Sequence, residues 1–158
     1  MSSFSPSEIY QFAVKIEENG EKFYRTMADK LNNPQIKELF TFLADEEVEH
    51  KATFKDMLSK FENYDPPESY PGEYFDYLEA YAENLVFTFK KFDGDILEIN
   101  DIETALRFAI EKELDTIQYF QEMQNLVHES EVKKIEAIIE EERKHVVKLF
   151  QFKRDLQS

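Results

Sequence analysis

The sequence predicts an all-α fold, a four-helix bundle with a long crossover connection, and two observations support this prediction. Four long segments carry apolar residues at the 3.6-residue period of an α-helix, and strand-like alternation is absent. Only three Gly and five Pro occur in 158 residues, which leaves few turns. The first and second segments, and the third and fourth, are joined by short turns, so each pair is expected to form antiparallel neighbours.

The first pair of helices is predicted over residues 5–62. Ser5-Pro6 supplies a serine N-cap followed by a proline in the first turn, and the apolar stripe then continues to about Leu31. Asn33-Pro34 begins a second helix in the same way, and its apolar stripe extends to Phe61.

The second pair is predicted over residues 101–155. Asn100 and Glu103 have the spacing of a capping pair before a stripe that reaches Val127. The fourth helix is expected to follow Ser130.

Residues 63–100 are predicted to be the crossover. Pro66-Pro67 and Pro71-Gly72 break the helix, a shorter amphipathic helix is expected from Tyr74 to Phe89, and Asp93-Gly94 is expected to turn the chain again. A second small domain is the alternative, but about forty residues are too few for an independent core. The prediction is therefore one domain over residues 1–158.

Polar residues interrupt the apolar faces at positions that repeat between the two halves. A shift of 95 residues superposes Glu47 on Glu142 and His50 on His145, and a shift of 96 superposes Glu17 on Glu113. At 100° per residue, all of these side chains face the core, with Glu17 on the flank of its stripe. The candidate site residues are Glu17, Glu47, His50, Glu113, Glu142 and His145.

Four buried carboxylates without partners would each cost several kcal/mol, and no Lys or Arg lies near them within the stripes. Two divalent cations would balance the four charges, with neutral imidazoles completing the ligand set. The i, i+3 spacing of Glu and His places both side chains on one helical face, where they can reach the same ion. This mixture of oxygen and nitrogen ligands favours iron, with manganese or zinc possible in its place. The alternative is a set of core polar groups that satisfy one another without metal.

Six further residues have simpler interpretations. Tyr24 is interpreted as a core residue, with a hydrogen bond to a ligand carboxylate as the alternative. Glu140-Glu141 and Asp45-Glu46 are interpreted as solvated, and the alternative for Asp45 or Glu46 is to support a ligand histidine. His128 is expected at the surface.

The overall charge limits the possible partners and location. Against 34 Asp and Glu stand 19 Lys and Arg, a formal net charge of −15, which argues against nucleic acid and membrane surfaces. The chain has no Cys, and residues 1–6 do not resemble a signal segment, so a cytoplasmic location is expected.

Two segments resemble the rubrerythrin branch of the ferritin-like di-iron carboxylate proteins. Residues 16–24, IEENGEKFY, look like that branch's first helix, and residues 44–50, ADEEVEH, look like its second. The resemblance implies a ferritin-like bundle that binds two iron ions through the six candidate residues, with Glu47 and Glu142 as the candidates to bridge them. It also implies a homodimer and an oxidoreductase that reacts with hydrogen peroxide or dioxygen, using an external electron-donor protein.

The sequence departs from this family in two ways. Classical rubrerythrins carry a rubredoxin-like domain with a four-cysteine iron site, and this chain has no Cys. They also usually carry a glutamate three residues beyond the third-helix ligand, where this chain has Thr116, so the resemblance does not extend to that family's redox-linked ligand exchange. Two alternative functions remain at this point: a ferritin-like iron-binding or ferroxidase protein, and a non-catalytic acidic bundle that binds a protein partner.

Overall fold

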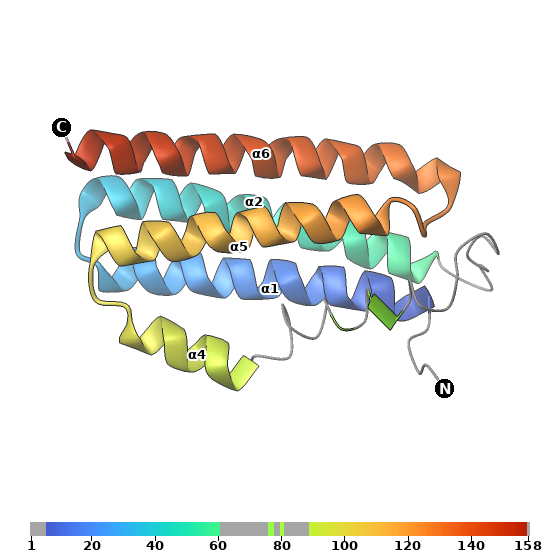
Figure 1. Cartoon of the computed structure of the whole chain (residues 1–158), viewed down its shortest axis with the longest axis horizontal. Coiled ribbons are helices and arrows are strands. Elements are labelled where there is room, and N and C mark those ends of the chain that lie inside the picture. Colours follow the sequence, from blue (N-terminus) through green and yellow to red (C-terminus); the bar gives the residue numbers. More distant parts are fainter. Residues whose placement is uncertain (1–5, 61–75, 78–79, 81–88, 158) are drawn as a thin grey trace.

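In the computed structural model, which describes residues 6–60, 76–77, 80 and 89–157, four long helices lie side by side. They are α1 (Pro6–Lys30), α2 (Pro34–Ser59), α5 (Ile102–Met123) and α6 (Glu129–Gln157). Figure 1 shows α1 and α6 running in one direction and α2 and α5 in the other. The predicted all-α four-helix bundle is confirmed.

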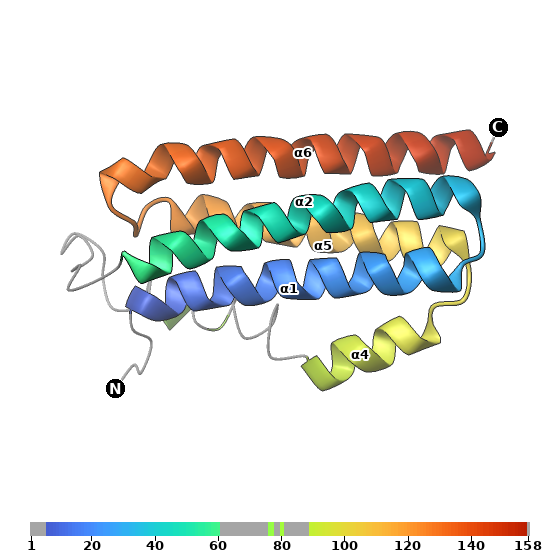
Figure 2. The same ribbon diagram turned by 180° about the vertical axis from the view of Figure 1, so that it is seen from behind.

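The connection from α2 to α5 crosses the length of the bundle. Figure 2, the view from behind, shows that α2 ends at the opposite end of the bundle from the start of α5. The described part of this connection includes a shorter helix, α4 (Phe89–Glu98), which continues through the Asp93-Gly94 pair. The predicted turn at Asp93-Gly94 is therefore wrong, because one glycine in a helix costs only about 1 kcal/mol and packing can offset that. Most of the helix predicted from Tyr74 to Phe89 lies outside the described residues.

The helix starts follow the capping chemistry of the sequence with one correction, at α5, and the predicted Ser5 cap lies outside the described residues. Asn33 caps α2 as predicted, because its side chain accepts a hydrogen bond from the Ile36 amide at 2.9 Å. The cap of α5 is Asp101, which accepts from the Thr104 amide and hydroxyl at 3.3 and 2.6 Å, and not the predicted Asn100. A carboxylate at this position also interacts favourably with the positive end of the helix dipole.

The turn between α5 and α6 is longer than predicted. The α5 helix ends at Met123, yet Leu126 and Val127 stay buried, so the apolar stripe continues through a non-helical turn. The α6 helix begins at Glu129 and therefore includes Ser130, which the helix was predicted to follow. His128 lies exposed in this turn, as predicted, and its Nδ1 accepts a hydrogen bond from the Ser130 amide at 3.1 Å.

The hydrophobic core consists of two parts. One part lies towards the start of α1 and includes Ile9, Phe54 and Phe120, while the other lies towards its end and includes Met27, Phe40 and Leu106. Each half of α1, α2 and α5 supplies one of these parts, so the middle of each helix lies between them. This middle layer carries the polar residues discussed below. No described helix is long and apolar enough to span a bilayer.

Candidate metal centre

All six predicted site residues are buried in the layer between the two parts of the core. Their exposed fractions range from 0% for Glu17 and Glu142 to 5% for Glu113. Glu17 lies on α1, Glu47 and His50 on α2, Glu113 on α5, and Glu142 and His145 on α6. The sequence placed Glu17 at the flank of its stripe, but it is among the most deeply buried of the six, since neighbouring helices cover that flank.

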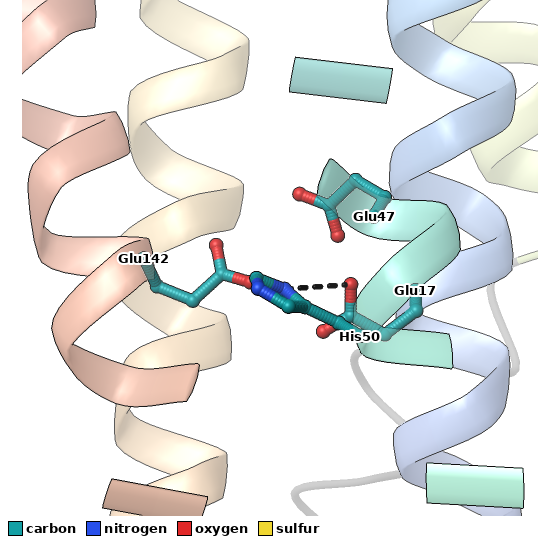
Figure 3. Close-up of side chains that lie close together, drawn as sticks. All are labelled: Glu17, Glu47, His50 and Glu142. Atoms are coloured by element: carbon teal, nitrogen blue, oxygen red, sulfur yellow. Dashed lines mark hydrogen bonds and ion pairs between the residues drawn. The ribbon is translucent and has the colours of Figure 1, made fainter. Parts of the chain in front are cut away.

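The six side chains form two overlapping groups whose ligand atoms lie within 4.8 Å of one another. One group, the His50 half, consists of Glu17, Glu47, His50 and Glu142. Figure 3 shows these four side chains converging from three helices, with Glu142 facing the other three. The second group, the His145 half, consists of Glu47, Glu113, Glu142 and His145. Glu47 and Glu142 belong to both groups, as bridging residues must.

The imidazole of His50 connects the cluster to the outer surface of the bundle. Its Nδ1 lies 2.8 Å from Glu142 Oε1 and 3.6 Å from Glu17 Oε2. Its Nε2 lies 2.5 Å from Glu141 Oε2, and the Glu141 side chain is 45% exposed. Glu141 is therefore partly solvated, as interpreted, and it also holds the side of the ring that faces away from the cluster.

Neighbouring carboxylates take the roles that the sequence left open. Asp45, 67% exposed, pairs with Arg25 at 3.1 Å and does not reach a histidine. Glu46 offers a carboxylate oxygen to the group that contains His50 and Glu141. No sequence pattern identifies Glu141 as the residue in contact with His50, because the two lie 91 positions apart on different helices.

The His145 half is supported through its carboxylate. Tyr24, 2% exposed, donates its hydroxyl hydrogen to Glu113 Oε1 at 2.7 Å, so the alternative interpretation of this residue is correct. His145 Nδ1 lies 3.3 Å from Glu142 Oε2. Its ring stacks at 6.0 Å from that of His50, which places the two imidazoles on the same side of the cluster.

Gly20 makes room for one of the shared carboxylates. A Cβ at this position would lie 3.0 Å from both Cδ and Oε2 of Glu47. Such a contact is tighter than van der Waals packing normally allows, so Gly20 lets α1 approach the carboxylate closely. The sequence analysis assigned Gly20 only to an apolar stripe and missed this role.

Burial and mutual repulsion change the protonation of the cluster. Burial, and then the negative charge of Glu142, raise the pKa of Glu17, Glu47 and Glu113 above the ordinary range of a carboxyl group. Burial would also raise the pKa of Glu142, but interactions with Glu113, His145 and His50 outweigh it and hold that pKa below its usual range. Without metal, Glu142 is therefore the carboxyl group of the cluster that ionises most readily.

The pKa of His50 follows from the same arrangement. Burial alone would lower it, but the hydrogen bond to Glu142 and the nearby charge of Glu17 raise it to about 12. A cationic His50 beside an ionised Glu142 is one way in which the metal-free cluster balances its charge.

The donor set fits two divalent ions better than it fits an internally satisfied polar core. Both oxygens of Glu17 and Oε2 of Glu113 are buried without a hydrogen-bond partner in the described part of the chain. Unpartnered buried oxygens of this kind are costly, and a bound cation would satisfy them. Carboxylate oxygens mixed with imidazole nitrogens suit iron, manganese or zinc.

Comparison with known proteins agrees with this arrangement. The family model for Rubrerythrin matches residues 8–153. A protein from Thermotoga maritima, provisionally described as a ferritin-like diiron-carboxylate protein, has a crystal structure that matches with a TM-score of 0.67 and 28% identity, covering 94% of each chain. No curated protein matches the chain.

Proposed function

The chain belongs to the rubrerythrin family, and from this premise we propose that it binds two iron ions and reduces hydrogen peroxide or dioxygen. The observation that supports this function best is the pair of overlapping four-residue groups that share Glu47 and Glu142. In this proposal Glu17 and His50 would hold one ion, Glu113 and His145 would hold the other, and Glu47 and Glu142 would supply carboxylate oxygens to both.

The charges of the cluster suit two divalent ions. Four carboxylates from four helices converge in one layer and carry four negative charges when they are ionised. Two divalent ions would balance these charges once the carboxyl protons and the extra proton of His50 have left. Because burial and the charge of Glu142 raise the pKa of Glu17, Glu47 and Glu113, metal ions must compete with protons for these carboxyl groups. Iron affinity should therefore increase with pH.

Bound iron would supply the two electrons that, with two protons, convert one hydrogen peroxide into two water molecules, after which an external electron-donor protein restores them. The chain's own residues exclude bulk water, because all six side chains are at most 5% exposed. Tyr24 fixes Glu113, and Glu141 fixes His50, so each half has one ligand whose orientation is set from outside the ligand set.

The test combines metal analysis with anaerobic kinetics. The purified protein is reconstituted with ferrous iron, and we expect two iron ions per chain. One equivalent of hydrogen peroxide should oxidise both ions, and added reductant should allow turnover. Less than about 0.2 iron per chain would exclude both this function and a ferroxidase role, because a preformed site should fill.

Two further outcomes separate this proposal from the alternative functions. Net accumulation of iron well beyond two ions per chain, without reductant-dependent turnover, would favour iron binding or ferroxidase activity. A protein that binds a partner but no stoichiometric metal would instead be the non-catalytic acidic bundle.

A further inference from the structure

Phe42 lies on the outer surface of α2 and links that surface directly to the metal cluster. Its side chain is 40% exposed. The ring packs edge to face with the imidazole of His145, with 6.3 Å between the ring centroids and 83° between the ring planes. The His145 ring in turn stacks on the ring of His50 at 6.0 Å. Three aromatic rings therefore lead from solvent to both halves of the cluster.

The surface is hollowed on both sides of Phe42. One groove, between α2 and α6, is lined by Phe42 and by His145, which is itself only 3% exposed. The other groove is also lined by Phe42 and has apolar wall from Leu39 and Phe152. Figures 1 and 2 show α2 and α6 side by side where these grooves lie. The two grooves and the Phe42 ring between them are called the Phe42 face below.

The charged groups of the Phe42 face are mostly carboxylates. The grooves are lined by four glutamates and two lysines, which are Glu38, Glu46, Glu49, Glu141, Lys144 and Lys148. The Lys148 ammonium lies 4.0 Å from the centre of the Phe42 ring, in a cation–π contact. The face is therefore acidic, as is the chain as a whole with its net charge of −15. Local and overall charge both favour a positively charged partner.

The proposed function needs a route for electrons. Each hydrogen peroxide that is reduced to two water molecules takes up two electrons and two protons, and an external protein has to replace the electrons. All six ligand candidates are at most 5% exposed, and electron transfer slows steeply with distance, so the donor needs a surface point close to the cluster. Proteins that exchange electrons associate through small interfaces, which one exposed ring and two shallow grooves can provide.

We propose that the Phe42 face is the docking site of the external electron donor, that this donor is a redox protein with a positively charged contact surface, and that electrons tunnel to the cluster through the rings of Phe42 and His145. Neither ring is itself oxidised or reduced. The inference rests on the proposed function, and it names the chemistry of the partner and the surface that receives it.

The first experiment tests the docking site with ferrocytochrome c, a basic protein that gives up one electron. Two molecules are oxidised for each hydrogen peroxide that the iron-loaded protein reduces, and the haem absorbance reports the rate. The double variant Glu38→Lys/Glu49→Lys should raise KM for ferrocytochrome c about tenfold and leave kcat unchanged, because charges at the rim control association. High salt should remove most of this difference.

A matched control separates local charge from overall charge. Glu136→Lys/Glu140→Lys makes the same change in net charge, but in the groove between α5 and α6. Its KM for ferrocytochrome c should stay close to the wild-type value. An equal rise of KM in the two double variants would overturn the docking site, because the charge of the whole chain would then decide association.

The second experiment tests the ring. Phe42→Leu keeps an apolar side chain without the ring, and kcat with ferrocytochrome c should fall severalfold while KM changes little. Phe42→Tyr keeps the ring and should restore kcat. Phe150→Leu removes a ring that is similarly exposed, at 44%, and should have no effect. Reduction by dithionite, which needs no docking site, and iron content should stay at wild-type values in all three. An unchanged kcat in Phe42→Leu, or equal slowing with dithionite, would overturn the role of Phe42.

A third measurement does not depend on turnover. A carbodiimide joins a carboxylate to a lysine amine that is in contact with it. When the iron-loaded protein is treated in this way with oxidised cytochrome c, the cross-linked peptides found by mass spectrometry should contain Glu38 or Glu49, and not Glu136 or Glu140. Cross-links spread evenly over these four positions, or concentrated on the second pair, would overturn the docking site.

These outcomes differ from failure of the proposed function. If the iron-loaded wild type does not reduce hydrogen peroxide even with dithionite, the proposed function is wrong and this inference falls with it. If the wild type turns over with dithionite but not with ferrocytochrome c, only the inference is wrong.

Discussion

The His50 half and the His145 half of the cluster contain the same types of side chain but are supported in different ways. In the His50 half, the histidine is held from outside, by Glu141 at 2.5 Å. In the His145 half, the carboxylate is held from outside, by Tyr24 at 2.7 Å, and a cavity between α1 and α5 borders the site. The internal repeat thus reproduces the ligands and not their surroundings.

This difference has a functional meaning within the proposal. In the His50 half, the hydrogen bond between His50 and Glu141 can keep a bound ion in a fixed position. A half that borders a cavity can admit a small molecule. The comparison predicts that variants at the shared residues affect both halves, while variants at the supporting residues affect one.

The largest effect is expected from removal of a shared carboxylate. Glu142→Ala deletes an oxygen pair common to both groups and leaves Nδ1 of the buried cationic His50 without its hydrogen-bond acceptor. Loss of one partner of a buried ion pair costs about 3–5 kcal/mol of stability, and both iron ions should be lost. Iron content and urea denaturation measure these effects. Glu140→Ala, an exposed change two residues away, should alter neither, and an E142A protein that kept one full iron site would show that the halves are independent.

The second effect is the dependence of metal-free stability on pH. The raised pKa values of Glu17, Glu47 and Glu113 make the folded protein bind more protons than the unfolded chain above about pH 4.5, so stability falls as pH rises. His50 acts in the same direction, because its pKa of about 12 exceeds the ordinary 6.5. Its contribution is complete below pH 6.5 and is lost as pH rises towards 12. The lowered pKa of Glu142 matters only below about pH 4.5, where its contribution is lost.

Thermal denaturation in chelator should therefore give a Tm that decreases from pH 5 to pH 9. His50→Gln removes the titration of His50, so the Tm should decrease less steeply above pH 6.5. Bound iron should flatten the decrease throughout, because the metal replaces the protons. A Tm that rises over this range in the metal-free wild type would contradict the assigned protonation.

The fold and the ligand candidates could be predicted from the sequence because both depend on helical periodicity. Glu47 and His50 interrupt an apolar stripe, and that position alone places them in the core. Asn33 was recognised as a cap because capping is local, requiring only a side chain and the amide three residues later. Asp101 was missed because Asn100 beside it has similar chemistry, and only the backbone geometry decides between the two.

The supporting residues could not be predicted because they act across helices. The contact between His50 and Glu141 depends on how α2 and α6 are rotated against each other, which periodicity does not give. The role of Gly20 depends on how closely α1 approaches Glu47. The helix at Asp93-Gly94 was missed for a related reason, since Ile96 and Ile99 pack into the core and offset the local preference for a turn.

The third prediction concerns the His145 half alone. Tyr24→Phe removes the hydroxyl that donates to Glu113 and leaves a buried carboxyl oxygen without a partner, at a cost of about 1–3 kcal/mol. Iron affinity in this half should fall about 10–100-fold, while the His50 half keeps its ion. Tyr119→Phe is the matched control, because it removes a buried hydrogen bond of 3.0 Å to the Ile9 carbonyl, away from the cluster. Competitive iron titration should show weaker binding in Y24F and not in Y119F, although both lose stability.

The smallest effect is expected in the His50 half, from Glu141→Gln. Glutamine keeps the size of the side chain and can still accept from His50 Nε2, but it removes the charge that strengthens this hydrogen bond. Because the Glu141 side chain is 45% exposed, water can compensate, and iron affinity should fall by about tenfold at most. Mössbauer spectra of the ⁵⁷Fe-loaded protein should show a change at one iron only, and Glu140→Gln, whose side chain pairs with Arg143, should show none. Changes of equal size at both ions would mean that Glu141 acts on the bundle as a whole, and the distinction between the two halves would then be wrong.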